Sequence, residues 1–283
     1  PKLFPAIYVR MIAAGETAGK MEESLQQIVI QMKKTHQLTS TIRGAMIYPS
    51  VIIIAIVAVG IMMTTVVLPK LIGLFDEFDS ALPLATRILI AFTKTMSNPI
   101  NLTVIFASVI ALLVLFIIGL KKFPDFKRAI HNFNLHLPIA GSVIKQINLA
   151  RFTLTLSSLL ESTLPIIQAV ENAGETCGNV LYKNSLKSAA EKLKSGQALS
   201  EILRTEPKLF PPMVTEMIMV GERTGEIDRL LADLADFYSG EVDKTMKNFS
   251  TIIEPVIIIL LGFGVAGIAV AVIMPMFTLI QDF

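Results

Sequence analysis

The chain has 283 residues, of which 53% are hydrophobic and only 17% are charged, and its mean hydropathy is +0.63. Soluble domains carry about 25% charged residues, so this composition indicates a membrane protein. The formal net charge is only +2. Because acidic and basic residues are interleaved, the sequence lacks the basic stripe of a nucleic-acid-binding protein.

Two segments that lie 206 positions apart repeat one pattern. Residues 1–28 read PKLFPAIYVRMIAAGETAGKMEESLQQI, and residues 207–234 read PKLFPPMVTEMIMVGERTGEIDRLLADL. The register holds further along, where Pro49 aligns with Pro255. Each copy passes from a polar helical segment into an uncharged stretch. A duplication of this length predicts a repeated architecture for the whole chain.

Three long windows contain no charged side chain: residues 44–69, 95–120 and 255–281. A helix rises 1.5 Å per residue, so about 20 residues cross a hydrocarbon core of about 30 Å. The sequence therefore predicts transmembrane helices at 44–69, 100–120 and 255–277. The fold class that we expect is all-α and polytopic.

Lysine and arginine residues flank the predicted spans unequally, and such residues concentrate on the cytoplasmic side of a membrane. The basic residues next to the spans are Lys33, Lys34, Arg43, Lys121, Lys122, Lys127, Arg128, Lys244 and Lys247. They place residues 1–43 and 121–254 in the cytoplasm. The loop 70–99 and the tail 278–283 are then expected outside.

Residues 121–254 show helical periodicity without a convincing strand pattern, and prolines and glycines mark the helix ends. The predicted helices cover residues 148–160, 166–174, 180–194, 198–204 and 212–225, and a sixth begins at 226 and continues toward the third span. This pattern predicts a cytoplasmic six-helix bundle.

The first copy enters this plan only at the fifth helix, because the counterpart of residues 148–206 is missing before Pro1. We therefore interpret residues 1–43 as the C-terminal part of a first, incomplete cytoplasmic repeat. Its apolar face is expected to have lost its natural cover; that face consists of Leu3, Phe4, Ile7, Met11, Ile12, Leu25 and Ile28.

The external loop carries apolar residues at helical spacing in two groups. The first group is Leu71, Ile72, Phe75 and Phe78, and the second is Ile88, Leu89 and Phe92. We expect short amphipathic helices that lie on the outer membrane surface or against a partner.

A G-E-x-x-G element occurs once in each copy, as Gly15, Glu16 and Gly19 and again as Gly221, Glu222 and Gly225. One interpretation is structural: the first glycine permits close packing, the second ends the helix, and the carboxylate caps a helix or pairs with a base. The other interpretation is a turn exposed to a cytoplasmic partner. The two are compatible.

Several residues near the spans are candidates for membrane-boundary and packing roles. Pro49, Pro255 and Glu254 mark the predicted inner boundary, where the carboxylate either caps a helix start or faces a partner. Gly60, and Gly262 with Ala266, fit the small-residue pattern that lets spanning helices approach closely. Gly262 also begins a G-x-G-x-x-G string, but nucleotide binding would place a phosphate in hydrocarbon.

The sequence contains no recognisable catalytic or cofactor-binding constellation. Its three histidines lack metal-ligand spacing, and it has no P-loop, nucleophile elbow or H-E-x-x-H motif. We therefore expect no enzyme activity, no cofactor and no metal.

Four strings together resemble the type II secretion system F family. They are RGAMIYP at residues 43–49, ALPLATR in the external loop, HLPIAG at 136–141 followed by ARFTLTLSSLL, and the doubled LFP…GExxG. The resemblance covers essentially the whole chain. It implies an inner-membrane platform protein, without enzyme activity, of type II secretion or type IV pilus assembly.

The resemblance also implies partners. Such platforms couple a cytoplasmic assembly ATPase to the extraction of pilin or pseudopilin subunits, contact other inner-membrane assembly proteins, and form homo-oligomers. Family members have been given a calcium site on carboxylates four residues apart. The matching positions are Gln26 and Ile30 in copy one and Ala232 and Asp236 in copy two, so this chain departs from that pattern and we do not carry the metal over.

The alternative hypothesis is a transporter or channel subunit. Transport commonly requires ionisable residues or broken helices in mid-membrane. The three uncharged windows contain neither, so the sequence favours the platform.

Overall fold

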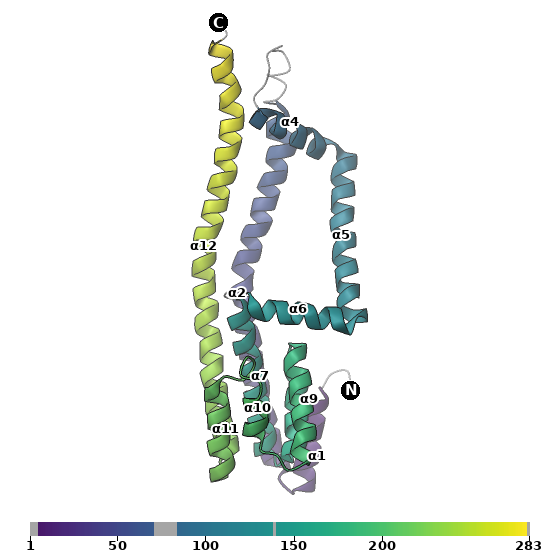
Figure 1. The fold of residues 1–283 in the computed structure, drawn as a ribbon, viewed down its shortest axis with the longest axis vertical. Helices are drawn as coiled ribbons and strands as arrows, with labels where there is room; N and C mark the ends of the chain where they lie inside the picture. Colours follow the sequence, from purple (N-terminus) through teal and green to yellow (C-terminus); the bar gives the residue numbers. More distant parts are fainter. Residues whose placement is uncertain (1–4, 71–83, 138–139, 282–283) are drawn as a thin grey trace. The chain divides into compact units, whose positions relative to one another are not determined.

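The computed structural model describes residues 5–70, 84–137 and 140–281, and within these ranges the regular structure is helical, with no strand (Figure 1). The elements in chain order are α1 (Ala6–Thr17), α2 (Met21–Met62), the π-helical turn η1 (Met63–Val67), α4 (Leu84–Ser97), α5 (Pro99–Lys122), α6 (Pro124–His136), α7 (Ala140–Glu161), α8 (Ile166–Thr176), α9 (Val180–Lys194), α10 (Leu199–Arg204), α11 (Pro212–Thr224) and α12 (Ile227–Gln281). The predicted all-α class is confirmed.

The chain divides into two compact units. The first unit comprises Pro1–Gly44 and Phe123–Lys247, and the second comprises Ala45–Lys122 and Asn248–Phe283. Both α2 and α12 are single helices that begin in the first unit and end in the second. The polar part of each repeat copy therefore continues as a helix into its own apolar part.

The second unit contains the apolar helices. Three helical segments are long and apolar enough to cross a membrane: Met21–Lys70, Pro99–Lys122 and Ile227–Val270. The side chains of α5 are all at least partly exposed. Outward-facing leucine, isoleucine and valine are favourable where hydrocarbon is the solvent, so these helices are three candidate membrane spans, as the sequence predicted.

The first span is not a uniform α-helix, although the sequence predicted one over 44–69. The five residues of η1 form a π-helical turn, whose widened geometry disturbs the regular backbone hydrogen bonds. Thr64 Oγ1 donates to the Gly60 carbonyl at 3.0 Å, and Thr65 Oγ1 donates to the Ile61 carbonyl at 2.7 Å. Ser97 Oγ of α4 donates to the Thr64 carbonyl at 3.0 Å. Hydroxyl groups thus satisfy carbonyls that hydrocarbon could not.

An amphipathic helix occupies the second half of the loop that joins the first two candidate spans. α4 packs against η1 and α5, burying Thr93 while Ile88 and Phe92 stay exposed. This agrees with the helix expected around Ile88, Leu89 and Phe92. The first expected helix, at residues 71–78, lies outside the described residues.

The first unit has a core built around three aromatic rings. Phe210 packs edge-on against Phe152, with centroids 5.8 Å apart, and against Tyr182, with centroids 5.5 Å apart. The Tyr182 hydroxyl donates to the Leu209 carbonyl at 2.8 Å. The second LFP string therefore places its phenylalanine in the core, where edge-to-face pairs are favourable.

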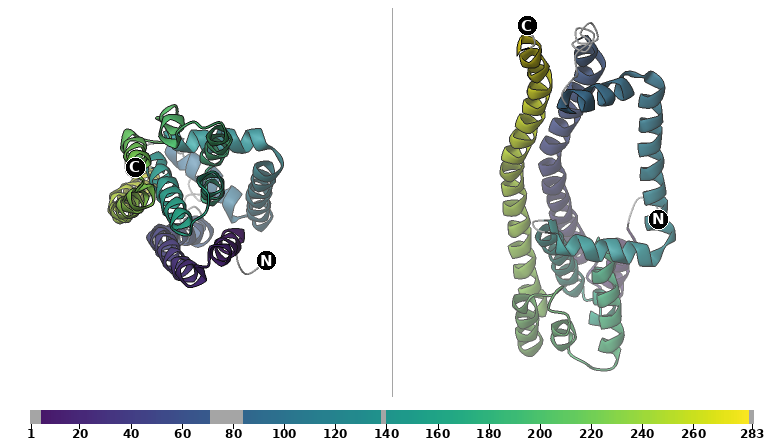
Figure 2. Two further views of the ribbon diagram at one scale, coloured as in Figure 1. Left: turned by 90° about the horizontal axis from the view of Figure 1, so that it is seen from below. Right: turned by 45° about the horizontal axis from the view of Figure 1, so that its top comes forward.

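The first repeat copy packs against the second repeat within this unit (Figure 2, left, where α1 and α2 are purple). The Arg10 guanidinium donates to Asn172 Oδ1 on α8, and Gln31 Nε2 donates to Thr155 Oγ1 on α7 at 3.5 Å. Met11 is fully buried and Ile28 is 6% exposed. The expectation that these two residues are uncovered is wrong, because both are buried in the unit that the two copies form together.

Two other residues of this face are exposed in the first copy. Ile12 is 37% exposed and Leu25 is 45% exposed, whereas their repeat-related residues Ile218 and Leu231 are fully buried. Ile7 is half-buried. Leu3 and Phe4 lie outside the described residues. Equivalent positions of the two copies therefore differ in burial.

This difference predicts unequal costs for one substitution at repeat-related sites. Leu231→Ala should destabilise the first unit by about 2–5 kcal/mol, because a fully buried leucine leaves a cavity. Leu25→Ala should change the stability by less than about 0.5 kcal/mol.

Cys177 provides the measurement, because it is the single cysteine of the chain and is 1% exposed in the first unit. Burial raises the pKa of its thiol to about 12, so the reactive thiolate forms only on opening. Thiol labelling of the detergent-solubilised protein should accelerate about thirtyfold or more in Leu231→Ala. Equal acceleration in Leu25→Ala would contradict the assignment.

Candidate interaction site

The second G-E-x-x-G element forms the sharp turn between α11 and α12. Gly225 ends α11 with a left-handed backbone, at φ 77°. A Cβ on Gly221 would lie 2.7 Å from the Cα of Ile227, so only glycine permits this approach of the two helices. The two glycines therefore set the angle at which α12 leaves α11, as the structural interpretation expected.

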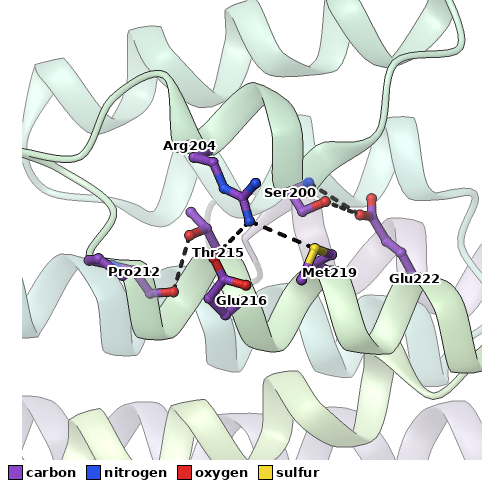
Figure 3. Close-up of polar contacts among 7 residues, drawn as sticks. All are labelled: Ser200, Arg204, Pro212, Thr215, Glu216, Met219 and Glu222. Carbon is purple, nitrogen blue, oxygen red and sulfur yellow. Dashed lines mark hydrogen bonds and ion pairs between the residues drawn. The ribbon is translucent and has the colours of Figure 1, made fainter.

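Glu222 caps the short helix α10 with its carboxylate (Figure 3). Oε1 accepts the Leu199 backbone N–H at 2.6 Å, and Oε2 accepts the Ser200 backbone N–H at 3.3 Å and also the Ser200 hydroxyl. Leu199 and Ser200 are buried, so their N–H groups have lost water as a partner. A carboxylate at a helix N-terminus also suits the positive end of the helix dipole.

An exposed ion pair also joins α10 to α11 (Figure 3). The Arg204 guanidinium lies 2.7 Å from Glu216 Oε1 and 3.7 Å from the Met219 sulfur. Both charged groups are about half exposed, so this ion pair contributes little stability compared with the buried cap.

The first G-E-x-x-G element has the same local turn in a different environment. A Cβ on Gly15 would lie 2.6 Å from the Ser24 Cβ, and Gly19 has φ 70°. Glu16 is exposed, and no helix in the described ranges presents its N-terminus to it as α10 does to Glu222. Within the described residues, the repeated motif therefore presents an exposed carboxylate in one copy and a helix cap in the other.

An apolar groove lies directly after this exposed turn, on the first turns of α2. Its volume is about 730 Å³, and it is lined by Met21, Glu22, Leu25, Gln26, Val29 and Ile30. The repeat-related residues Leu231 and Ala235 are buried in the second copy. The exposed turn at Gly15 to Gly19 and this groove together form the candidate interaction site.

The positions that matched the family's calcium carboxylates lie apart from any acidic cluster. Gln26 and Ile30 line the apolar groove, and Asp236 Oδ1 pairs with the Lys34 ammonium at 2.6 Å. Across residues 5–70, 84–137 and 140–281, no group of three or more metal-binding side chains comes together. The donor set here does not fit a calcium site.

The predicted boundary residues lie within continuous helices. Pro49 lies inside α2 and is buried, whereas Glu254 and Pro255 are exposed on α12. A Cβ on Gly60 or Gly262 would meet no heavy atom of the described chain within 4 Å, and Ala266 is exposed. The close helix approach predicted at these small residues does not occur within the described part of one chain.

Comparison with known proteins identifies the family to which this chain belongs. A sequence model described as type II secretion system protein F matches residues 1–69 and 152–275. The chain belongs to the type II secretion system protein F family.

Relatives in this family carry names from two machines. The chain is 32% identical over 285 residues to the type IV pilus assembly protein PilC of Thermus thermophilus and 31% identical over 279 residues to PilC of Myxococcus xanthus. It is 30% identical over 281 residues to the type II secretion system protein F of Pseudomonas aeruginosa. Each match covers 99% of the chain and 66–68% of the relative. The chain therefore spans about two thirds of the length of these family members.

Two features of the site were not found from the sequence. One is the cap on α10, in which Glu222 accepts the N–H groups of Leu199 and Ser200 from 22 or more positions along the chain. The other is Phe210 of the LFP string, which packs in the core. The core position of Phe210 could have been predicted, because the apolar LFP string occurs in both copies. The cap could not, since it depends on how α10 packs on α11.

The cap predicts different consequences for the same substitution in the two copies. Glu222→Ala should cost about 1–3 kcal/mol, because two buried N–H groups lose their acceptor. Glu16→Ala should change the stability by less than about 0.5 kcal/mol. Cys177 labelling measures both, and Glu222→Gln, which keeps an acceptor oxygen, should lie between wild type and Glu222→Ala. Equal labelling rates for the Glu222→Ala and Glu16→Ala variants would disprove the capping role.

Proposed function

We propose that this protein is a non-enzymatic inner-membrane platform that couples a cytoplasmic assembly ATPase to the assembly of pilin or pseudopilin subunits. The observation that carries the proposal is family membership over nearly the whole chain, with relatives named for type IV pilus assembly and for type II secretion. Helices that run from a packed polar unit into membrane-spanning segments suit a protein that transmits force between compartments.

The proposed topology places the first unit in the cytoplasm. Arg43 precedes the first span, Lys121 and Lys122 follow the second, and Lys247 precedes the third. The positive-inside preference supports this orientation, with α4 and the C-terminal tail outside. The bacterial inner membrane is then the location, since both machines of the relatives act in bacteria.

We infer that the exposed turn of the first copy contacts the ATPase. Gly15 and Gly19 hold the turn, and Glu16 presents a carboxylate without a partner in the described chain. The equivalent turn at Gly221, Glu222 and Gly225 is engaged with α10, so the first copy is the more accessible of the two. The apolar groove beside it suits an amphipathic helix of a partner, as in helix-in-groove recognition.

The spans and α4 are proposed to contact the pilin or pseudopilin helices and other inner-membrane assembly proteins. Glu254 lies exposed at the proposed inner boundary, where a carboxylate can pair with a basic group of a client. Gly60, Gly262 and Ala266 are proposed to contact a second copy, and disulfide cross-linking of cysteines placed at position 266 in the membrane would test that homo-oligomer. Family membership favours this platform over a transporter or channel subunit.

Capture of the ATPase tests the proposal. The full chain in nanodiscs, carried by an affinity tag, should capture the assembly ATPase of the same organism. Glu16→Lys should reduce this capture about tenfold, because a reversed charge at an interface opposes a complementary patch. The control is Glu171→Lys, the same charge reversal at an exposed glutamate of α8.

The outcomes separate the platform from its proposed contact. No capture by wild-type protein, with ATP, ADP or no nucleotide, would refute ATPase coupling. Capture that Glu16→Lys and Glu171→Lys leave equal would refute the contact at the exposed turn and keep the platform.

A further inference from the structure

Helix α6 carries an apolar stripe on its outward face. Phe126 and Phe133 lie seven residues apart, so they share one side of the helix, and Leu137 directly follows its end. Phe123, directly before the helix, is 63% exposed, and the three stripe residues are 42%, 65% and 36% exposed. Four large apolar side chains on one short segment form a surface that water solvates poorly.

The opposite side of α6 is fixed to the first unit. Leu135 is buried, and His131 Nδ1 accepts the Val180 N–H at the start of α9, at 3.1 Å. Asn179 Nδ2 donates to the His131 carbonyl at 3.2 Å. Burial, together with the Lys127 charge, lowers the pKa of His131, so the ring stays a neutral acceptor at neutral pH. These contacts hold the rotation of α6, and the stripe must face away from α9.

α6 covers one end of the first unit. α12 leaves the unit at this same end and continues toward its span. α6 runs across the beginnings of α7 and α9 (Figure 1). Gln146, near the start of α7, accepts a hydrogen bond from Thr245 of α12 at 3.0 Å. Thr245 lies two residues before α12 leaves this unit at Lys247. Because α12 continues past Glu254 into the uncharged stretch 255–281, this end of the unit is the one from which the chain runs toward the membrane.

The covalent link from the second span fixes α6 further. α5 ends at Lys122 and α6 begins at Pro124, so Phe123 alone joins them. One residue spans at most about 3.6 Å, which keeps the first turn of α6 within a few ångströms of the end of a membrane-spanning helix. The segment that bears the stripe therefore starts at the membrane surface.

We infer that α6 is a membrane-surface helix, whose stripe of Phe123, Phe126, Phe133 and Leu137 enters the lipid and whose neighbouring lysines bind anionic headgroups. Lys121 and Lys122 are exposed in the last turn of α5, and Lys127 lies on the flank of the stripe. An apolar face that enters the headgroup–acyl boundary by about 5–10 Å, flanked by cations, is the pattern of interfacial helices. Each lysine near an anionic leaflet adds an attraction that falls off within a Debye length.

The lipid surface fits this face better than a protein partner does. The stripe lies at the membrane-facing end of the unit, beside cations that an anionic leaflet complements. Anchoring there would hold the first unit against the bilayer at three places, at α2, α12 and α6. The inference rests on the spans and not on the proposed role in pilus assembly or secretion.

Tryptophan fluorescence tests the inference, because the chain contains no Trp and a single substitution is the sole probe. Phe133→Trp is introduced in the full chain, which is reconstituted into vesicles. Its fluorescence should be about twofold weaker in lipids brominated near the top of the acyl chain than in unbrominated lipids. It should also resist quenching by aqueous acrylamide. Phe126→Trp serves as a second probe position on the same stripe.

Phe237→Trp is the matched control, since Phe237 is a similarly exposed phenylalanine, 49% exposed, on α12 of the same unit. It should be quenched by acrylamide and not by brominated lipid. If Phe133→Trp behaves like this control, α6 faces water and the inference fails. If it resists both quenchers, a protein partner or a second copy covers the stripe, and the inference also fails.

The role of the lysines is tested with the same probe. Brominated phosphatidylglycerol diluted into phosphatidylcholine should quench Phe133→Trp about twofold more than brominated phosphatidylcholine at the same fraction, since the cations enrich anionic lipid. Lys121→Gln with Lys122→Gln and Lys127→Gln should abolish this preference and keep the quenching itself. A preference that survives the three substitutions would overturn the lysine assignment.

Discussion

The structure depends on one constraint: backbone polar groups inside hydrocarbon must find their partners within the same segment. The chain meets it by continuing α2 and α12 from the first unit directly into their spans, so the helical hydrogen bonds continue through the boundary. Where the first span widens into the η1 turn, Thr64 and Thr65 supply hydroxyl donors to nearby carbonyls. The first and third spans are therefore continuations of helices that begin in the first unit.

A duplicated sequence placed in two environments explains most of the remaining features. In the second copy α11 and α12 bury their apolar face, and Glu222 caps α10. In the first copy the same face divides: Met11 and Ile28 are buried, whereas Leu25 lines an open groove. One sequence pattern thus lies in the core in one place and at the surface in another. The candidate interaction site results from this asymmetry.

Several features meet at the end of the first unit that α6 covers. α12 leaves it at Lys247, α6 covers it, and its exposed aromatic stripe continues from the second span through Phe123. His131 fixes that stripe through a bond to α9 that only tertiary packing provides.

The three apolar stretches, the repeat and most helix boundaries could be predicted from the amino-acid sequence, since hydrophobic length, proline and glycine act within a few residues of where they occur. α9 at Val180–Lys194 and α11 ending before Gly225 followed from such local signals. Three other features became known from the folded structure: Met11 is buried and Leu25 is not, Glu222 caps α10, and the phenylalanines of α6 are exposed. Burial is decided by contacts between residues far apart in the chain, and two identical patterns cannot reveal which of them has a neighbour.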